Sequence, residues 1–280
     1  MSSALEDNPL KLAVIAGSGD LVKNLLSSLK QEVFIDTFVI GFEGITPDEF
    51  LLQAQSKVFK LGEVQRVLDQ LKTWGVTDIV FLGGMKRPNF SSLSLDFKGI
   101  RWLSRMGVKA FGDDGLLSSI ALFLKEEGFT VRGAHEFLDS TIKTLGSLTL
   151  IKPSHQDLKD IQKGVDLLKL FSPLDIGQSV VIQTGVVLGV EAVEGTQKLI
   201  KRVGGYKHSL AYPTGGILVK MSKTCQDERL DRATIGVQTI LDLKESGLNG
   251  IAIKAGDVNI INPLKVIKIA DELDIFIESF

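Results

Sequence analysis

The amino-acid sequence predicts an α/β protein, and three features of its 280 residues lead to that fold class. In the first half, short apolar runs alternate with segments of helical hydrophobic spacing, which favours a parallel sheet covered by helices. This alternation fades between residues 134 and 138. The second half contains a β-rich run broken by a glycine turn, which indicates antiparallel pairing. We therefore expect an N-terminal Rossmann-like parallel-sheet domain over residues 1–137 and a C-terminal mixed α/β domain over residues 138–280.

The first strand, turn and helix form a unit suited to binding phosphate. Residues 11–16 are a continuous apolar run, typical of a buried parallel strand, and leucines at helical spacing follow from residue 21 to 29. The turn between them is Gly17-Ser18-Gly19-Asp20. Free N–H groups at the start of a helix attract phosphate, although the third glycine of a dinucleotide fingerprint is replaced by Val22. A tight turn without a ligand is the alternative interpretation.

A second glycine-rich turn is expected at the end of another strand of the same sheet. The pattern predicts a strand over residues 33–40, a helix over 64–74 closed by Gly75, and a strand over 78–82. Ligands bind parallel sheets at the carboxyl ends of the strands. The segment that follows this last strand therefore contains candidates for contacting a nucleotide phosphate or the substrate, with a solvated loop as the alternative. These candidates are Gly83, Gly84, Met85, Lys86 and Arg87.

The second half has a different pattern. Residues 179–193 are β-rich and are broken at Gln183-Thr184-Gly185, which predicts a hairpin. Glu191 and Glu194 lie at its far end, and strand alternation would place them on opposite faces. The remaining expected elements are a helix over 112–128, a strand over 129–132, a helix over 156–170, a short helix or turn over 198–202, a helix over 234–245, a strand over 250–253, a helix around 266–270 and a strand over 275–277.

The segment from Gly215 to Gly236 contains the strongest candidates for catalytic residues. A short apolar strand over residues 217–219 ends on Lys220, and a polar turn follows. Cations neutralise the oxygens of a phosphate, while a carboxylate holds a divalent metal or orients a water. A solvated turn with surface ion pairs is the alternative. Within ten residues this turn carries Lys223, Asp227, Arg229, Asp231 and Arg232.

The same segment resembles the signature of a known enzyme family. Its pattern, Lys-x-x-Lys-x-x-Gln-Asp-x-Arg-x-Asp-x-x-Thr-Ile-Gly over residues 220–236, is similar to that of the UDP-2,3-diacylglucosamine diphosphatases of the LpxI type, in lipid A biosynthesis. Further blocks of this family occur in the same order, so the resemblance extends from about residue 12 to about residue 256. They are residues 16–21 (AGSGDL), 82–88 (LGGMKRP), 112–114 (GDD), 175–181 (DIGQSVV) and 190–196 (VEAVEGT).

The resemblance implies hydrolysis of a UDP-sugar lipid to UMP and a lipid-linked sugar 1-phosphate, and it assigns roles to these residues. Asp227 would be a metal ligand or the water-activating base, and Asp231 would orient Arg229 or share the metal. Oxygen ligands and a phosphate substrate favour Mg²⁺ or Mn²⁺. The cations that would clamp the diphosphate are Lys220, Lys223 and Arg229. Further substrate contacts are expected from Glu191, Glu194, Gly195 and Thr196, and the two glycine-rich turns would face the nucleotide.

Three positions depart from the family pattern, and two other functions stay open. Gln197 stands where the family has an aspartate, and Thr224 and Ala233 stand where it has prolines. Gln197 makes a non-catalytic nucleotide- or lipid-binding regulator one alternative. The glycine-rich turn after the first strand makes a nucleotide-sugar dehydrogenase or transferase that binds a dinucleotide the other.

The charge, the cysteine count and the hydropathy of the chain exclude some classes of partner and indicate a cellular compartment. A formal charge of −2 argues against a nucleic-acid binder, and the single cysteine, Cys225, fits a reducing compartment. Residues 1–10 lack the apolar segment of a signal peptide, and no apolar run approaches the roughly 18–20 residues that span a bilayer. We therefore expect a cytoplasmic protein that meets a glycolipid nucleotide at the membrane surface, on the inner face of the inner membrane. Assembly into a homo-oligomer is left open.

Overall fold

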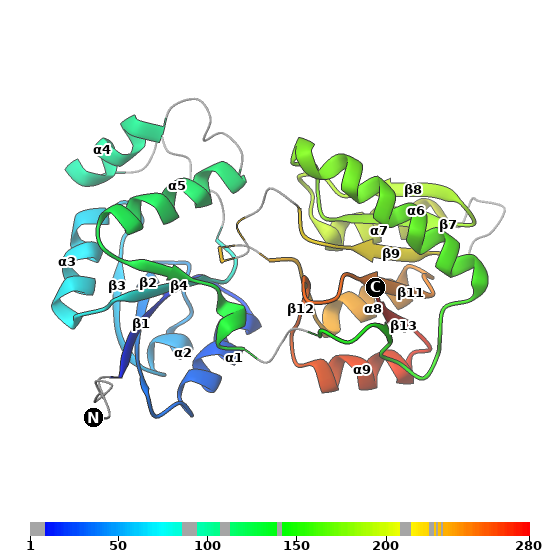
Figure 1. Cartoon of the computed structure of the whole chain (residues 1–280), viewed down its shortest axis with the longest axis horizontal. Coiled ribbons are helices and arrows are strands. Elements are labelled where there is room, and N and C mark those ends of the chain that lie inside the picture. Colours follow the sequence, from blue (N-terminus) through cyan, green and yellow to red (C-terminus); the bar gives the residue numbers. More distant parts are fainter. Residues whose placement is uncertain are drawn as a thin grey trace, which may run out of the picture. The chain divides into compact units, whose positions relative to one another are not determined.

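The computed structural model describes residues 9–85, 94–106, 113–138, 142–207, 214–223, 227, 229–230 and 232–280. The chain divides into two compact units (Figure 1). The N-terminal unit comprises residues 1–139 together with 229–231, and the C-terminal unit comprises residues 140–228 and 232–280. Each unit contains its own sheet and its own hydrophobic core.

The N-terminal unit contains a five-stranded sheet in the order β3-β2-β1-β4-β5, and every pair in it is parallel. The order reverses direction between β1 and β4, which makes the carboxyl ends of these two strands the topological switch point of the sheet. This confirms the predicted Rossmann-like parallel sheet. The strands are β1 (Leu10–Ala16), β2 (Ile35–Phe42), β3 (Gln55–Phe59), β4 (Asp78–Leu82) and β5 (Thr130–Arg132).

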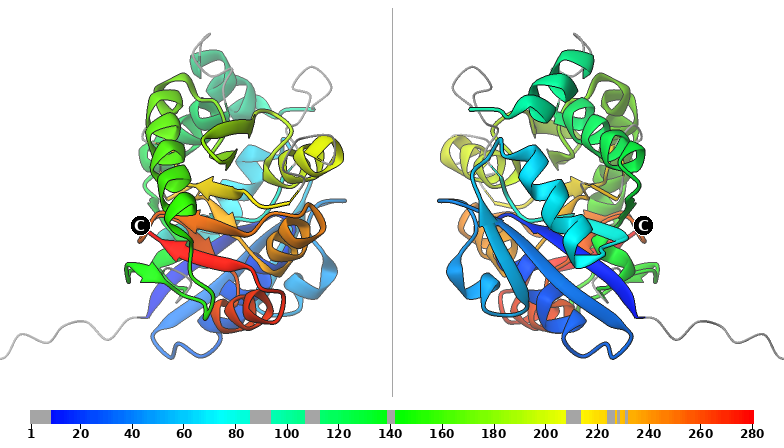
Figure 2. Two further views of the ribbon diagram at one scale, coloured as in Figure 1. Left: turned by 90° about the vertical axis from the view of Figure 1, so that its right-hand side faces the viewer. Right: turned by 90° about the vertical axis from the view of Figure 1, so that its left-hand side faces the viewer.

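Helices cover both faces of this sheet (Figures 1 and 2). Alternate residues of β1 point to opposite faces, so that Leu12 and Val14 pack with α1 while Ala13 and Ile15 pack with α3 and α5. Burial on both faces explains why β1 is a continuous apolar run. The helices are α1 (Asp20–Leu29), α2 (Asp48–Leu51), α3 (Val64–Trp74), α4 (Phe97–Met106), α5 (Asp113–Glu126) and the short 3₁₀ helix η3 (Ala134–Glu136).

Helix ends and strand β4 agree closely with the sequence predictions in this unit, while β2 differs. The helix α3 ends at Gly75, which adopts a left-handed conformation with φ of 68°. Strand β2 begins two residues later than expected, because Val33 and Phe34 are exposed in the turn before it. The elements α2, β3 and α4 were not predicted. The first two span only four and five residues and carry little periodic signal, whereas α4 has a clear amphipathic period that the sequence analysis missed.

The C-terminal unit contains a mixed six-stranded sheet in the order β6-β13-β11-β9-β7-β8, as its predicted mixed class requires. The strands β9, β11 and β13 are parallel, and the pairs β6–β13, β7–β9 and β7–β8 are antiparallel. A separate two-stranded ladder joins β10 and β12. The strands are β6 (Gly146–Ser147), β7 (Ser179–Gln183), β8 (Val186–Val190), β9 (Ile217–Lys220), β10 (Thr234–Ile235), β11 (Gly250–Ile253), β12 (Asn259–Ile260) and β13 (Phe276–Ser279).

One helix lies on one face of this sheet and three lie on the other (Figure 2, left). Val219 of β9 packs with α6, whereas Leu218 packs on the side of α7, α8 and α9. The helices are α6 (His155–Phe171), the 3₁₀ helix η4 (Ser172–Leu174), α7 (Thr196–Lys207), α8 (Val237–Glu245) and α9 (Pro263–Glu272). None of the helices in the described part of the chain is long and apolar enough to cross a membrane.

The predicted hairpin is confirmed, and two helix predictions are corrected. Thr184 and Gly185 connect β7 to β8 with φ values of 47° and 78°, as a two-residue turn with positive φ at both positions requires. The helix expected from residue 234 begins instead at Val237, because Thr234 and Ile235 pair with β12. The short helix or turn expected over 198–202 is a longer helix that extends to Lys207.

Candidate functional site

A buried lysine at the carboxyl end of β9 is bound by two hydroxyl groups. Lys220 is only 4% exposed. Its Nζ donates to the Thr196 Oγ1 at 2.6 Å and to the Ser179 Oγ at 3.4 Å. The Thr196 hydroxyl in turn donates to the Glu191 Oε2 at 2.9 Å. The structure therefore brings together three residues that the sequence analysis selected, Lys220, Thr196 and Glu191.

Strand order explains why these side chains meet. Ser179 begins β7 and lies directly opposite Lys220 in the antiparallel ladder. The strands β8 and β9 run in the same direction, so the loop that leaves β8 reaches the edge of the sheet where β9 ends. This loop carries Glu191, and the helix α7 begins from it at Thr196. The cluster therefore lies at the carboxyl edge of the parallel strands, where open α/β sheets bind ligands.

Glu191 and Glu194 have different environments, as expected. The expected cause, alternation of side chains along a strand, does not apply. Strand β8 ends at Val190, so neither glutamate belongs to it. Glu191 is buried in the Lys220 cluster, and Glu194 instead accepts hydrogen bonds from the Ala192 N–H and from Arg202 at 2.6 Å. The hydrogen bond from Arg202 lowers the pKa of Glu194 below its ordinary value. Glu194 is thus bound to the surface of α7, outside the Lys220 cluster.

The residues that flank the charged loop (residues 223–231), Ser222 on one side and Arg232 and Ala233 on the other, are held by hydrogen bonds. The Ser222 N–H donates to the Asp257 Oδ2 at 2.9 Å, and the Ser222 hydroxyl donates to the Asp257 carbonyl at 3.2 Å. The same hydroxyl accepts the Ala233 N–H at 3.2 Å. Arg232 donates to the Gly256 carbonyl. Because proline has no N–H, the alanine at position 233 permits a bond that the family's proline would not make.

The structure describes three of the four expected catalytic residues in the charged loop. Lys223 forms an ion pair with Asp175 and is 12% exposed. Asp227 is partly buried, and Arg229 is exposed. Asp231 lies outside the described residues.

In the N-terminal unit, the two glycine-rich turns are in direct contact at the switch point. The Gly17 N–H donates to the Leu82 carbonyl at 2.8 Å, and Ser18 and Gly84 exchange backbone hydrogen bonds at 3.0 and 2.8 Å. A Cβ on Gly17 would lie 2.6 Å from the Gly84 carbonyl oxygen. The turns therefore require glycine because their backbones touch. Ser18, Gly19, Asp20, Gly83, Gly84 and Met85 are exposed there.

Two residues beside these turns, Asp20 and Val22, bear on whether the turns bind a nucleotide or a dinucleotide. Asp20 is the first residue of α1, whose N-cap is Gly19, so its carboxylate does not cap the helix. Val22, at the third position of the dinucleotide fingerprint, is fully buried, and a Cβ on Gly83 would lie 2.6 Å from its Cγ2. In a dinucleotide-binding turn a third glycine would allow the close packing at this position. Here the Val22 side chain packs against Gly83 instead. Lys86 and Arg87 lie outside the described residues.

The sequence analysis missed several residues that the structure places at the site. Ser179 and Asp175 belong to the block 175–181 but had no role assigned, since their partners Lys220 and Lys223 are more than forty residues away. Gln197, noted only as a departure, donates from its Nε2 to the Asp242 Oδ2 at 3.0 Å. No local pattern marks Asp242, because an aspartate within a helix usually lies at the surface.

Comparisons with known proteins match both halves of the chain to one family. The LpxI N-terminal domain family matches residues 11–141, and the LpxI C-terminal domain family matches residues 144–278. A protein from Caulobacter vibrioides named UDP-2,3-diacylglucosamine pyrophosphatase LpxI is 34% identical over 271 residues, which cover 95% of this chain and 96% of that protein.

A solved structure is only distantly similar. The biotin carboxylase domain of 2-oxoglutarate carboxylase from Hydrogenobacter thermophilus is 14% identical with a TM-score of 0.22, over 71% of this chain and 41% of that one, a likeness that carries no argument. The two domain families, by contrast, match nearly the whole chain in order, and the named relative covers the same span. The chain therefore belongs to the LpxI family.

Proposed function

We propose that this protein hydrolyses the diphosphate of UDP-2,3-diacylglucosamine to UMP and 2,3-diacylglucosamine 1-phosphate in lipid A biosynthesis. The observation that carries the proposal is the likeness, along the whole chain, to a protein named for this pyrophosphatase activity, together with a buried lysine cluster in the matched C-terminal domain. In the reaction, the oxygen of a water forms a bond to one phosphorus. The bond from that phosphorus to the bridging oxygen breaks, and the leaving phosphate carries the bridging oxygen away.

Lys220 is the cation best held for binding the diphosphate. Its ammonium group is buried and oriented by the hydroxyls of Thr196 and Ser179, so its direction is set before the substrate arrives. A preorganised cation stabilises the charge that develops on phosphate oxygens at little reorganisation cost. Lys223 and Arg229 are further phosphate clamps in this proposal, and Asp231 orients Arg229 or shares the metal.

Asp227 is proposed as the ligand of Mg²⁺ or Mn²⁺ or as the base that activates the water. Among the residues that the structure describes, no group of three or more His, Cys, Asp or Glu side chains is arranged to hold a metal. Magnesium is usually held by one or two carboxylates, with substrate phosphates and waters completing its coordination. The partly buried carboxylate of Asp227 fits that type of site. A bound divalent cation would neutralise charge on the diphosphate.

The remaining parts of the proposal concern the nucleotide and the membrane. The exposed glycine-rich turns of the N-terminal unit offer backbone groups at a topological switch point, and we assign them to the nucleotide. Because the substrate is diacylated, the enzyme would work in the cytoplasm, peripherally on the inner face of the inner membrane. The alternative of a dinucleotide enzyme is weakened because Val22 replaces the third glycine, and the alternative of a non-catalytic regulator rests on Gln197 alone.

The test is to incubate the purified protein with UDP-2,3-diacylglucosamine and Mg²⁺, Mn²⁺ or EDTA, and to follow UMP. We expect metal-dependent UMP release, and near-complete loss of turnover in Asp227→Ala with folding intact. Performing the reaction in H₂¹⁸O identifies the attacked phosphorus, because the label enters UMP or the sugar 1-phosphate. Substrate that binds without being cleaved would contradict the proposal and favour the regulator, and wild-type turnover of Asp227→Ala would remove Asp227 from the mechanism.

A further inference from the structure

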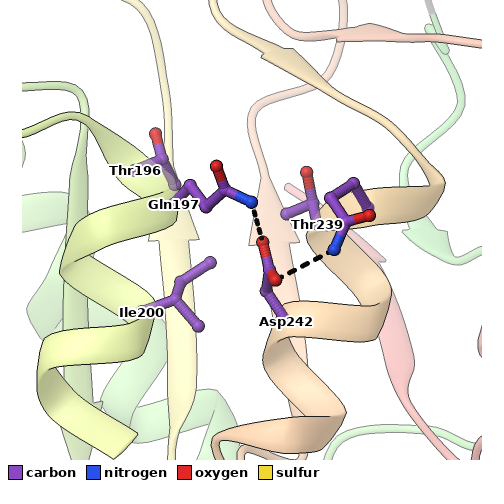
Figure 3. A pocket seen from close by; sticks show the side chains of 6 residues that line it. Thr196, Gln197, Ile200, Thr239 and Asp242 are labelled. Carbon is purple, nitrogen blue, oxygen red and sulfur yellow. Dashed lines mark hydrogen bonds between the residues drawn. The ribbon is translucent and has the colours of Figure 1, made fainter.

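A pocket lies between the N-terminal turns of α7 and α8, in the C-terminal unit (Figure 3). Its volume is about 240 Å³, roughly eight times the ~30 Å³ that a water occupies in the liquid, so it has room for one sugar ring. Apolar atoms form most of its lining surface, but five of its six lining residues also offer hydroxyl, amide or carboxylate groups. The lining residues are Thr196, Gln197, Ile200, Gln238, Thr239 and Asp242.

The buried carboxylate of Asp242 fixes the orientation of two amides in this pocket. Asp242 is 1% exposed, and it accepts the Nε2 of Gln197 and the Nε2 of Gln238, each at 3.0 Å. Lys201 lies 3.5 Å from the same carboxylate. An ionised carboxylate only accepts hydrogen bonds, so each glutamine must turn its NH₂ group toward it and its carbonyl oxygen away. In Figure 3 the oxygens of Thr196, Gln197 and Thr239 point away from the Asp242 side chain, towards the same side.

Thr196 connects this pocket to the buried lysine. Its side chain lines the pocket, and its hydroxyl oxygen accepts the Lys220 Nζ at 2.6 Å. A phosphate held by Lys220 would therefore lie beside the pocket, and the group esterified to that phosphate would be the one that enters it. The carboxylate at the base disfavours a second phosphate inside the pocket, whereas carbonyl and hydroxyl oxygens accept hydrogen bonds from neutral O–H groups.

We propose that this pocket binds the hydroxyl groups of a sugar attached to the diphosphate, through the carbonyl oxygens of Gln197 and Gln238. The assignment rests on the proposed function, because it needs a phosphate on Lys220. Two sugars flank the diphosphate, the ribose of UDP and the acylated glucosamine, and both present O–H donors. On this view Gln197 is a substrate contact in its own right, and Asp242 is the positioning residue that holds it.

Binding measured by calorimetry separates the two sugars. In the ribose arm, UDP is compared with 2′,3′-dideoxy-UDP, and in the hexose arm glucosamine 1-phosphate is compared with its 4,6-dideoxy analogue. In the arm whose sugar enters the pocket, the deoxy ligand should bind the wild-type protein about fivefold more weakly for each hydrogen bond lost. In Gln197→Met that difference should shrink, because the variant has no carbonyl to accept the hydroxyl.

Gln162→Met is the matched control. Gln162 donates to Asp166 at 3.0 Å with the same four-residue spacing as Gln238 and Asp242, but it is exposed on α6. The Gln162→Met variant should show the same difference in affinity between parent and deoxy ligands as the wild type, in both the ribose and the hexose arm. Gln238→Met repeats the comparison if Gln197→Met does not fold.

The outcomes separate this assignment from the proposed enzyme activity. Equal deoxy effects in wild type and in the glutamine variants, for both sugars, would overturn the assignment, as would failure of both parent ligands to bind. A hydroxyl effect that depends on Gln197, in a wild-type protein that releases no UMP, would support the sugar pocket and contradict the hydrolase.

Discussion

The Thr196 hydroxyl lies between the ammonium group of Lys220 and the carboxylate of Glu191, and it bonds to both. It accepts from Lys220 at 2.6 Å and donates to Glu191 at 2.9 Å. A hydroxyl has one proton to donate, so giving it to Glu191 leaves the oxygen lone pairs for Lys220. Together with the Ser179 hydroxyl, this side chain orients the buried cation.

Replacing Lys220 by methionine should lower kcat/KM for UMP release by about 10²–10³-fold, the usual effect of removing one preorganised donor from a developing oxyanion. Methionine keeps most of the side-chain volume but has no charge. Steady-state kinetics on the two proteins measures the loss. Lys198→Met, at an exposed position of α7, is the control and should keep wild-type kinetics. A Lys220→Met enzyme with normal kcat/KM would exclude the lysine from the diphosphate site.

Thr196→Val should cost about 1–3 kcal/mol of unfolding free energy, because the buried Glu191 carboxylate loses a donor. It should also lower kcat, since the ammonium group of Lys220 is no longer oriented. Thr196→Ser retains the hydroxyl and should recover both quantities. Urea unfolding and kinetics on the three proteins provide the comparison, and equal behaviour of valine and serine would show that the hydroxyl is unimportant.

Gly83→Ala should destabilise the N-terminal unit by about 1–3 kcal/mol, the range for a strained backbone position. Gly83 has φ of 99°, and a Cβ there would lie 2.6 Å from the Val22 Cγ2 and 2.8 Å from the Ser18 carbonyl oxygen. Its neighbour provides the control, because a Cβ on Gly84 meets nothing closer than the Ser18 Oγ at 3.5 Å. Urea unfolding should therefore separate the two variants, and equal stabilities would contradict the close contact between the turns.

Ser222→Ala should cost about 1–3 kcal/mol, because the Ala233 N–H loses its acceptor inside the protein. Adding Ala233→Pro should restore part of the loss, since proline has no N–H to satisfy and the family carries proline there. Chemical unfolding of the single and double variants measures the recovery. A double variant whose loss equals or exceeds that of Ser222→Ala would show that the N–H bond is not what holds the base of the loop.

The pKa of Glu194 should rise toward the ordinary glutamate value in Arg202→Gln. In the wild type the hydrogen bond from Arg202 lowers the pKa of Glu194, so the ionised pair stabilises the folded state above the unfolded pKa of about 4.3. That contribution is lost as the pH falls through the lower, folded pKa. NMR titration of the side-chain carboxyl carbon measures both values. An unchanged pKa in Arg202→Gln would show that the ion pair does not form in solution.

Local sequence patterns predicted much of the secondary structure because the periods of strands and helices depend on nearby residues. The apolar run of β1, the glycine at the end of α3 and the Thr184-Gly185 turn each have a local cause, and each is confirmed. Thr234 and Ile235 were wrongly assigned to a helix because a two-residue ladder with β12 has no periodic signal of its own. The resemblance added the family, and the matched domains confirm it.

The sequence by itself determined which residues were candidates, and only the tertiary structure decided which of them meet. Lys220 lies 24 residues from Thr196 and 41 from Ser179, and Gln197 lies 45 residues from Asp242. Their meeting depends on strand order and register, which follow from the packing of whole faces of the sheet rather than from any short segment. The same packing buries Asp242 beside Gln197. Gln197, which the sequence marked only as a departure from the family motif, therefore lines a pocket.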